Sequence, residues 1–229
     1  MKLDIVIPTL NRRDKLQTCI NSIFRSAKSE DISLYIYFGT QIELEYFKAQ
    51  LINVPNVYLR YLPEYKVPTF WNNYLAEMKA DALCYLNDDV ELYDDTLDVI
   101  MEDFQREFPS TDGVLGLNQI NIKDPRKVES AFGVIGTKYA DRFPNRQVWC
   151  PDYYRFYGDW ELWKRATDIG KFYFSEVARI NHYHPCTNSK LFDATHDAVR
   201  TYLKQDKITF QRRQSLNLLW GKDFKLINM

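Results

Sequence analysis

The sequence has little of what marks membrane-spanning, disulfide-rich or nucleic-acid-binding proteins. Its 229 residues include only four cysteines, and the formal net charge is −1. A charge so close to zero gives the whole chain no general attraction to nucleic acid or to anionic membranes. No apolar run approaches the length of a membrane-spanning helix. The first apolar stretch is short and interrupted by Asp4, so we expect neither a signal peptide nor a transmembrane segment.

The cysteines are scattered along the chain, at Cys19, Cys84, Cys150 and Cys186. Cys19 falls on the apolar face of a helical pattern, and Cys84 lies inside an apolar run that is typical of a buried strand. Reduced thiols in a core are the usual state in a reducing compartment. We therefore expect a cytoplasmic protein without disulfide bonds.

Apolar residues make up 45% of the chain, enough to bury a sizeable core. Their spacing predicts strands that alternate with helices. The expected strands cover residues 3–7, 32–38, 57–62, 82–86, 113–117 and 172–180. One expected helix follows Asn11 as its N-cap, and others cover residues 42–51, 70–79, 96–108 and 160–169. Such alternation is typical of an α/β fold with a mostly parallel sheet flanked by helices.

The most informative stretch is Asn87-Asp88-Asp89, which directly follows the apolar run 82–86. Two carboxylates after a buried strand lie at the carboxyl end of a sheet, where open α/β sheets bind their ligands. Hard oxygen donors there suit a divalent cation, which can in turn hold phosphate oxygens. The simpler alternative is a solvated turn that caps the next helix, since Asp and Asn favour both roles.

Four segments occur in an order that resembles a known family. They are residues 4–12, 86–89, 158–165 and 175–182. Together they resemble the inverting glycosyltransferases of family 2, over residues 1 to about 185. The resemblance implies a GT-A-like, Rossmann-like fold that binds a nucleotide sugar. It also implies transfer of the sugar to a hydroxyl acceptor, with inversion and with help from a divalent cation.

The resemblance assigns donor binding to the turn after the first strand, to the third helix and to the acidic stretch. The residues concerned are Pro8, Thr9, Asn11, Arg12, Trp71, Asn72, Asn87 and Asp88, with Arg13 as an alternative to Arg12. A turn at a strand end offers backbone amides, a hydroxyl and a cation to a base or phosphate. The alternative is an ordinary helix start with surface arginines.

The resemblance places the metal on Asp89 and His182, with His184 as an alternative ligand. Imidazole, carboxylate and phosphate oxygens together favour Mn²⁺ over Mg²⁺. Two other interpretations stay open. The histidines could be structural, or they could form a His-x-His-x-Cys zinc site with Cys186.

On the acceptor side the resemblance makes Asp159 the general base, with Glu161 as its competitor, and gives Trp160 and Glu161 to acceptor binding. A helix N-terminus stabilises the charge of a carboxylate, which weakens it as a base. The transfer can nevertheless proceed if the proton leaves late, when the acceptor hydroxyl has become acidic. Simple N-capping by Asp159 is the alternative.

The sequence also departs from the family. The second strand ends at Phe38 with no acid after it, so uracil recognition is in doubt, and Trp71 stands where relatives carry arginine and could stack on the donor. A catalytically silent nucleotide-sugar or protein-binding domain is therefore the main alternative. A nucleotidyltransferase would need a glycine-rich, lysine-bearing phosphate loop, which the start of the chain lacks.

The C-terminal part has its own charge. With no repeat or linker in the chain, we expect one domain over residues 1–190 and a helical basic extension over 191–229, packed on that domain or trailing from it. From residue 198 onward, seven basic and two acidic side chains leave a net charge of +5. Such a segment could contact the inner face of an anionic membrane or a polyanion. The acceptor is left open between a glycan, a lipid-linked molecule and modified DNA.

Overall fold

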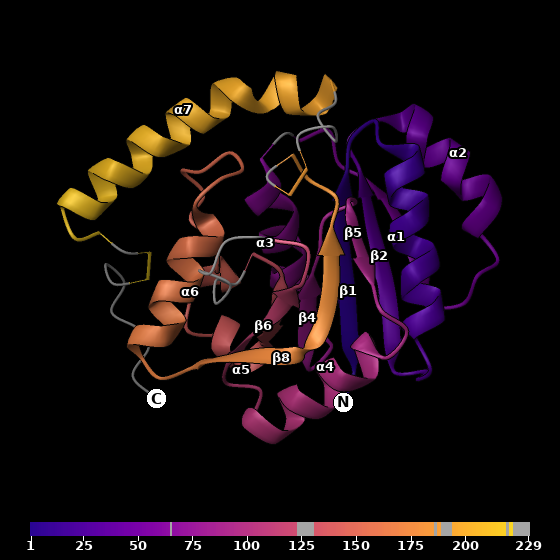
Figure 1. Ribbon diagram of the computed structural model, residues 1–229, viewed down its shortest axis with the longest axis horizontal. Coiled ribbons are helices and arrows are strands. Elements are labelled where there is room, and N and C mark those ends of the chain that lie inside the picture. The colour runs from indigo at the N-terminus through magenta and orange to yellow at the C-terminus, as the bar shows by residue number, and fades with distance from the viewer. Residues whose placement is uncertain (65, 123–130, 186, 189–193, 219, 222–229) are drawn as a thin grey trace.

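The computed structural model describes residues 1–64, 66–122, 131–185, 187–188, 194–218 and 220–221. They form a mixed sheet of eight strands flanked by helices (Figure 1). The strands are β1 (Leu3–Thr9), β2 (Ile32–Phe38), β3 (Val57–Tyr61), β4 (Ala82–Tyr85), β5 (Val90–Leu92), β6 (Val114–Gln119), β7 (Gly133–Gly136) and β8 (Phe172–His182). The helices are α1 (Arg13–Ser26), α2 (Gln41–Leu51), α3 (Val67–Glu77), α4 (Thr96–Glu107), α5 (Thr137–Ala140), α6 (Gly158–Asp168) and α7 (Ala194–Ser215), with a 3₁₀ turn at Pro144–Arg146.

The sheet has the strand order β3-β2-β1-β4-β7-β6-β8-β5. Strands β3, β2, β1 and β4 run parallel, whereas β7 pairs antiparallel with both β4 and β6. Strand β8 then runs parallel to β6 and antiparallel to β5. The predicted α/β class with a mostly parallel sheet is confirmed. Because β1 and β4 are parallel neighbours, the chain segments after these two strands lie at the same edge of the sheet.

Side chains alternate between two apolar layers, one on each face of the sheet. In β1, Leu3, Ile5 and Ile7 pack with α1, α2 and α4, while Val6 packs on the opposite face with α3, α5 and α6. This alternation is the period of two expected of a strand that is buried on both faces. The predicted core positions Cys19 and Cys84 are buried free thiols, as is Cys150, whereas Cys186 lies outside the described residues.

Some expected boundaries were wrong. Helix α1 begins at Arg13 and is not capped by Asn11, which adopts a left-handed φ of 55°. Helix α3 begins at Val67 rather than residue 70, because Pro68 occupies its first turn, a position that proline favours. Strands β5 and β7 were not predicted. Helix α6 begins at Gly158, so Asp159 lies inside its first turn.

Helix α7 lies across the edge at which the parallel strands end (Figure 1). Its Arg213 donates from Nε and Nη2 to the carboxylate of Glu161 on α6, at 2.9 and 3.2 Å. The same carboxylate accepts hydrogen bonds from the hydroxyl of Tyr153 at 2.7 Å and from the backbone N–H of Trp220 at 3.2 Å.

Within the described ranges, no helix combines the length and apolarity needed to cross a lipid bilayer.

The buried ion pair between Glu161 and Arg213 predicts that removing its cation destabilises the protein. Arg213→Met would leave the Glu161 carboxylate buried without its cation, so we expect a loss of about 3–5 kcal/mol in unfolding free energy. Arg212→Met is the matched control, since that side chain is 63% exposed, and it should change stability by less than about 0.5 kcal/mol. Urea unfolding measures both variants. Equal stability of the two would contradict the attachment.

Candidate functional site

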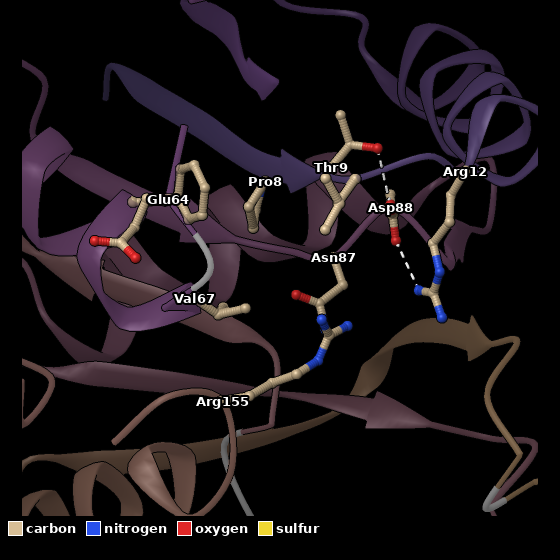
Figure 2. A pocket seen from close by; sticks show the side chains of 10 residues that line it. Pro8, Thr9, Arg12, Glu64, Val67, Asn87, Asp88 and Arg155 are labelled. Carbon is tan, nitrogen blue, oxygen red and sulfur yellow. Dashed lines mark hydrogen bonds and ion pairs between the residues drawn. The ribbon is translucent and has the colours of Figure 1, made fainter. Parts of the chain in front are cut away.

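The acidic stretch is buried and paired at the edge where β1 and β4 end. Thr9 Oγ1 donates to Asp88 Oδ2 at 2.9 Å. Arg12 Nη1 lies 3.0 Å from Asp88 Oδ1 (Figure 2). The same nitrogen lies 2.9 Å from Asp89 Oδ2. The pair directly precedes β5, and α4 begins only at Thr96. The alternative of a solvated helix-capping turn is therefore wrong.

The two carboxylates have different surroundings. Burial raises the pKa of Asp88, although Arg12 and Thr9 oppose that shift. Burial would do the same to Asp89, but contacts with His182 and Arg12 outweigh it and hold the pKa of Asp89 well below its ordinary value. Asp89 therefore stays ionised throughout the physiological range.

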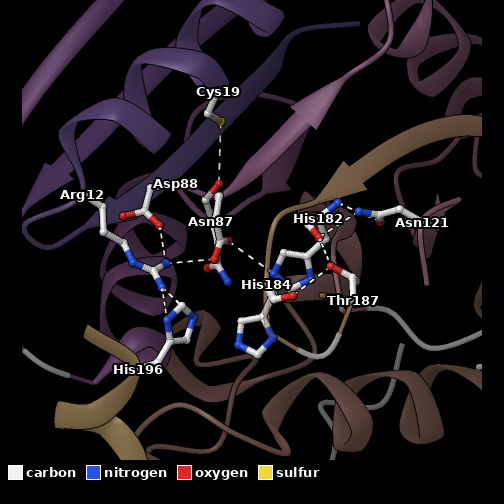
Figure 3. Close-up of polar contacts among 10 residues, drawn as sticks. Arg12, Cys19, Asn87, Asp88, Asn121, His182, His184, Thr187 and His196 are labelled. Atoms are coloured by element: carbon white, nitrogen blue, oxygen red, sulfur yellow. Dashed lines mark hydrogen bonds and ion pairs between the residues drawn. The ribbon is translucent and has the colours of Figure 1, made fainter. Parts of the chain in front are cut away.

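All three histidines of the sequence gather beside the acidic pair (Figure 3). His182, at the end of β8, has its Nε2 at 3.3 Å from Asp89 Oδ1. The ring of His184 stacks on that of His182, with centroids 5.0 Å apart, and its centroid lies 4.9 Å from that of His196 on α7. His196 Nε2 lies 2.8 Å from Arg12 Nη2. Burial, reinforced by the charge of His182, lowers the pKa of His184 to about 4, so this ring is neutral at physiological pH.

Part of this cluster fits a metal ion. Asp89 Oδ1 and His182 Nε2 are both buried, and among the residues that the structure describes neither atom meets the geometry of a hydrogen bond with a partner. Two ligand atoms bound at about 2.1 Å to one ion can stand roughly 3 Å apart, which matches their separation. Within the described part of the chain, no three His, Cys, Asp or Glu side chains are arranged to hold an ion. A cation here would thus take its other ligands from substrate and water. The zinc alternative with Cys186 lies outside the described residues.

A pocket of about 280 Å³ connects this cluster to the start of α6. Asn87, His182 and His184 line it, and so does Asp159 at the start of α6. Asp159 is half-buried, and its Oδ1 accepts the backbone N–H of Trp160 at 2.9 Å. Burial raises the pKa of Asp159 despite that hydrogen bond. The same pocket is thus lined by a weakly acidic carboxyl group and by His182, one of the two metal-binding candidates.

Aromatic side chains from α3 and from the segment before α6 line the same pocket. Trp71 lies against Tyr85 and Trp149, with ring centroids 5.4 and 4.9 Å apart. Asn72 exchanges two hydrogen bonds with the backbone of Trp149, at 2.8 and 3.1 Å, and lines neither this pocket nor that of Figure 2. Trp71 is thus part of the wall, whereas Asn72 fastens Trp149 in place.

Other residues singled out in the sequence lie elsewhere. Trp160 and Glu161 line a separate pocket of about 130 Å³ between α6 and α7, where Glu161 is already bonded to Arg213. Asn11 is exposed. Arg13 lies over the ring of Tyr46, 4.5 Å from its centroid. Of the two arginines, therefore, it is Arg12 that reaches the acidic pair.

Sequence reasoning missed three polar residues at this edge: Arg155, His196 and Asp206. Arg155 lies in a segment with no clear periodicity, and the other two lie on a helix that the sequence predicts only as a basic extension. The one usable signal was the scarcity of histidine, because His196 is one of only three in the chain.

Comparison with known protein families finds no match, and comparison with curated proteins finds none either. Solved structures do share the fold. The crystal structure of TarS 1–349 from S. aureus aligns with a TM-score of 0.64 and 12% identity, covering 100% of this chain and 76% of that chain. The same protein in complex with UDP aligns with a TM-score of 0.63 and 12% identity, covering 93% of this chain and 72% of that chain.

The mannosyltransferase PcManGT from Pyrobaculum calidifontis, solved with GDP-Man and Mn²⁺, aligns with a TM-score of 0.65 and 12% identity. The alignment covers 96% of this chain and 68% of that chain. At sequence identities this low, the similarity shows a shared fold only. The similarity confirms the predicted fold class: this chain has a GT-A-like, Rossmann-like α/β fold.

Proposed function

We propose that the protein is a glycosyltransferase that moves a sugar from a nucleotide-diphosphate donor to a hydroxyl acceptor with inversion. The observation that carries the proposal is the pocket of about 280 Å³, which Asn87, His182 and Asp159 line together. The fold it shares with a mannosyltransferase supports the same conclusion.

On the donor side, Pro8, Thr9, Arg12 and Asp88 line a small pocket that opens beside Asn87 (Figure 2). We assign the nucleotide to this end, since a hydroxyl, an arginine and buried carboxylates can together bind ribose and phosphate. Trp71 supports the sugar through its aromatic wall.

Asp159 is the proposed general base. The acceptor oxygen forms its bond to the anomeric carbon from the face opposite the diphosphate, the bond to the diphosphate oxygen breaks with its electron pair, and the acceptor proton passes to the Asp159 carboxylate. The raised pKa of Asp159 makes it a better proton acceptor than an exposed aspartate. Glu161 is less suited, because its carboxylate is taken up by Tyr153 and Arg213.

Asp89 and His182 are the proposed ligands of a divalent cation, Mn²⁺ rather than Mg²⁺ because of the imidazole. Such a cation supplies positive charge that stabilises the departing diphosphate. The chain's own contribution is to keep Asp89 ionised and His182 fixed. Asn121 bonds the backbone N–H and carbonyl of His182 through its side chain, at 3.0 and 2.9 Å.

One observation favours a second candidate, a silent nucleotide-sugar-binding domain. Arg12 already neutralises part of the acidic pair, so a donor could bind without a metal. Such a domain would bind the donor and release no nucleoside diphosphate.

We propose the acceptor only by the kind of surface that carries it. The exposed part of α7 carries four basic side chains, Arg200, Lys204, Lys207 and Arg212. They support an acceptor borne on an anionic surface, either a lipid-linked molecule or a polyanion.

The base assignment predicts the behaviour of Asp159→Asn. This variant cannot accept a proton, so transfer should fall by roughly 10²–10⁴-fold. Calorimetric affinity for UDP or GDP should stay within about twofold, because the substituted group lies on the acceptor side. Turnover at the wild-type rate would overturn the assignment.

The raised pKa of Asp159 predicts the pH dependence of the rate. A base works only when deprotonated, so kcat should fall as pH drops through this pKa, at a pH above the 3.8 of an ordinary aspartate. The profile is measured at saturating donor. The residual activity of Asp159→Asn should lack this acid limb, and a wild-type kcat that stays flat down to about pH 4 would count against the base.

The cation proposal predicts the effect of removing His182. In the wild type, Mn²⁺ should strengthen UDP or GDP binding, and His182→Ala should abolish most of that gain while leaving metal-free affinity nearly unchanged. Titrations with and without chelator measure both. Arg179→Gln, in which an exposed side chain is altered, is the control. An undiminished Mn²⁺ effect in His182→Ala would rule out this ligand.

A further inference from the structure

Arg155 lies where the two pockets meet. The small pocket beside Thr9 and Asp88 and the larger pocket beside Asp159 share three lining residues, Val67, Asn87 and Arg155. Figure 2 shows the side chain of Arg155 extending into the small pocket on the side of Asn87. Of the three shared residues, only Arg155 is charged. A molecule that extends from one pocket into the other must therefore pass this cation.

A guanidinium at this junction suits an anion by its chemistry. Arg12 is bonded to Asp88 and Asp89 at 3.0 and 2.9 Å, so its charge is directed at those carboxylates. A guanidinium offers two parallel N–H groups that match the oxygens of a phosphate. In a nucleotide sugar, the diphosphate is the part that joins the nucleoside to the sugar.

The backbone of Arg155 is held by one buried carboxylate on α7. Asp206 is fully buried, and its two oxygens accept the N–H groups of Tyr154, Arg155 and Phe156, each at 2.9 Å. Three consecutive amides that converge on one charged acceptor fix the course of this loop. A neutral or shorter side chain at this position would leave buried N–H groups without a full partner.

The residues around Asp206 continue the same attachment. The ring of Tyr202 stacks on Tyr154, and that of Phe210 stacks on Tyr157, each pair with centroids 4.6 Å apart. Tyr202, Asp206 and Phe210 follow one another at four-residue spacing, which places them on one face of α7. This face of α7 is thus built to hold the loop that carries Arg155.

We propose that Arg155 binds the diphosphate of the donor and that Asp206 of α7 is the positioning residue that presents it. This inference rests on the proposed function. It names the part of the donor that crosses the junction, and it gives the C-terminal helix a role in donor binding.

Calorimetry with UDP and GDP, compared with uridine and guanosine, tests the role of Arg155. Arg155→Gln should weaken binding of the better diphosphate by at least about tenfold and leave binding of its nucleoside unchanged. Arg155→Lys should recover only part of the loss, because an ammonium lacks the paired N–H groups. Arg179→Gln is again the control. Arg155→Gln binding the diphosphate as tightly as that control would overturn the inference.

A double-mutant cycle tests Asp206. Asp206→Asn should weaken diphosphate binding several-fold. The double variant Asp206→Asn/Arg155→Gln should bind the diphosphate as tightly as Arg155→Gln alone, because Asp206 acts on the diphosphate only through Arg155. Arg213→Met loosens α7 elsewhere, and it should lower stability without this loss of affinity. Additive losses of affinity in the double variant would show that Asp206 has only a structural role. Equal losses of affinity in Asp206→Asn and Arg213→Met would show the same.

Binding by the wild type and by Arg155→Gln together distinguishes failure of the proposed function from failure of the role of Arg155. A wild-type protein that binds no nucleoside diphosphate, with or without Mn²⁺, refutes the proposed function and this inference with it. A wild-type protein that binds a nucleoside diphosphate, with Arg155→Gln unimpaired, refutes only the role of Arg155.

Discussion

The site depends on the guanidinium of Arg12. Two adjacent buried carboxylates repel each other and lose hydration, which is unfavourable unless a cation and hydrogen-bond donors compensate. Arg12 supplies the cation to Asp88 and Asp89, and Thr9 supplies a hydroxyl to Asp88. Both compensating groups follow from one feature of the topology, because β1 lies parallel and adjacent to β4. The sheet order therefore determines that the acidic pair can be buried at all.

Helix α7 supplies further contacts that hold the candidate site together. Its His196 contacts Arg12, its Asp206 holds the loop before α6, and its Arg213 pairs with Glu161. Without α7, a buried carboxylate and three backbone amides would lose their partners, which costs more than an equal number of exposed contacts. The helix is therefore part of the site's construction, even though the sequence marks it mainly by its charge.

The sequence predicted features set by local pattern and missed those set by distant contacts. The parallel strands and the acidic stretch at a strand end follow from periodicity and chain order. Strand β7 was missed because Gly133 and Gly136 suggested a loop, yet a Cβ at either position would collide with a backbone carbonyl, of Leu115 or Thr111. The roles of Arg12, Arg155 and Asp206 depend on partners far away in the chain, and no spacing rule encodes such pairs.

The charges explain why a cation and Arg155 would both be needed. Arg12 balances only one of the two carboxylates Asp88 and Asp89, so one carboxylate charge at the strand ends is not balanced by this arginine. Glu64 lines the same small pocket as Arg155 and offsets its charge, so these side chains alone give a dianionic diphosphate no net attraction. The proposed divalent cation on Asp89 and His182 would add two positive charges, which equals in size the charge of the diphosphate. In the proposed function, the cation would supply long-range attraction, while Arg155 would fix the position of the diphosphate through directed hydrogen bonds.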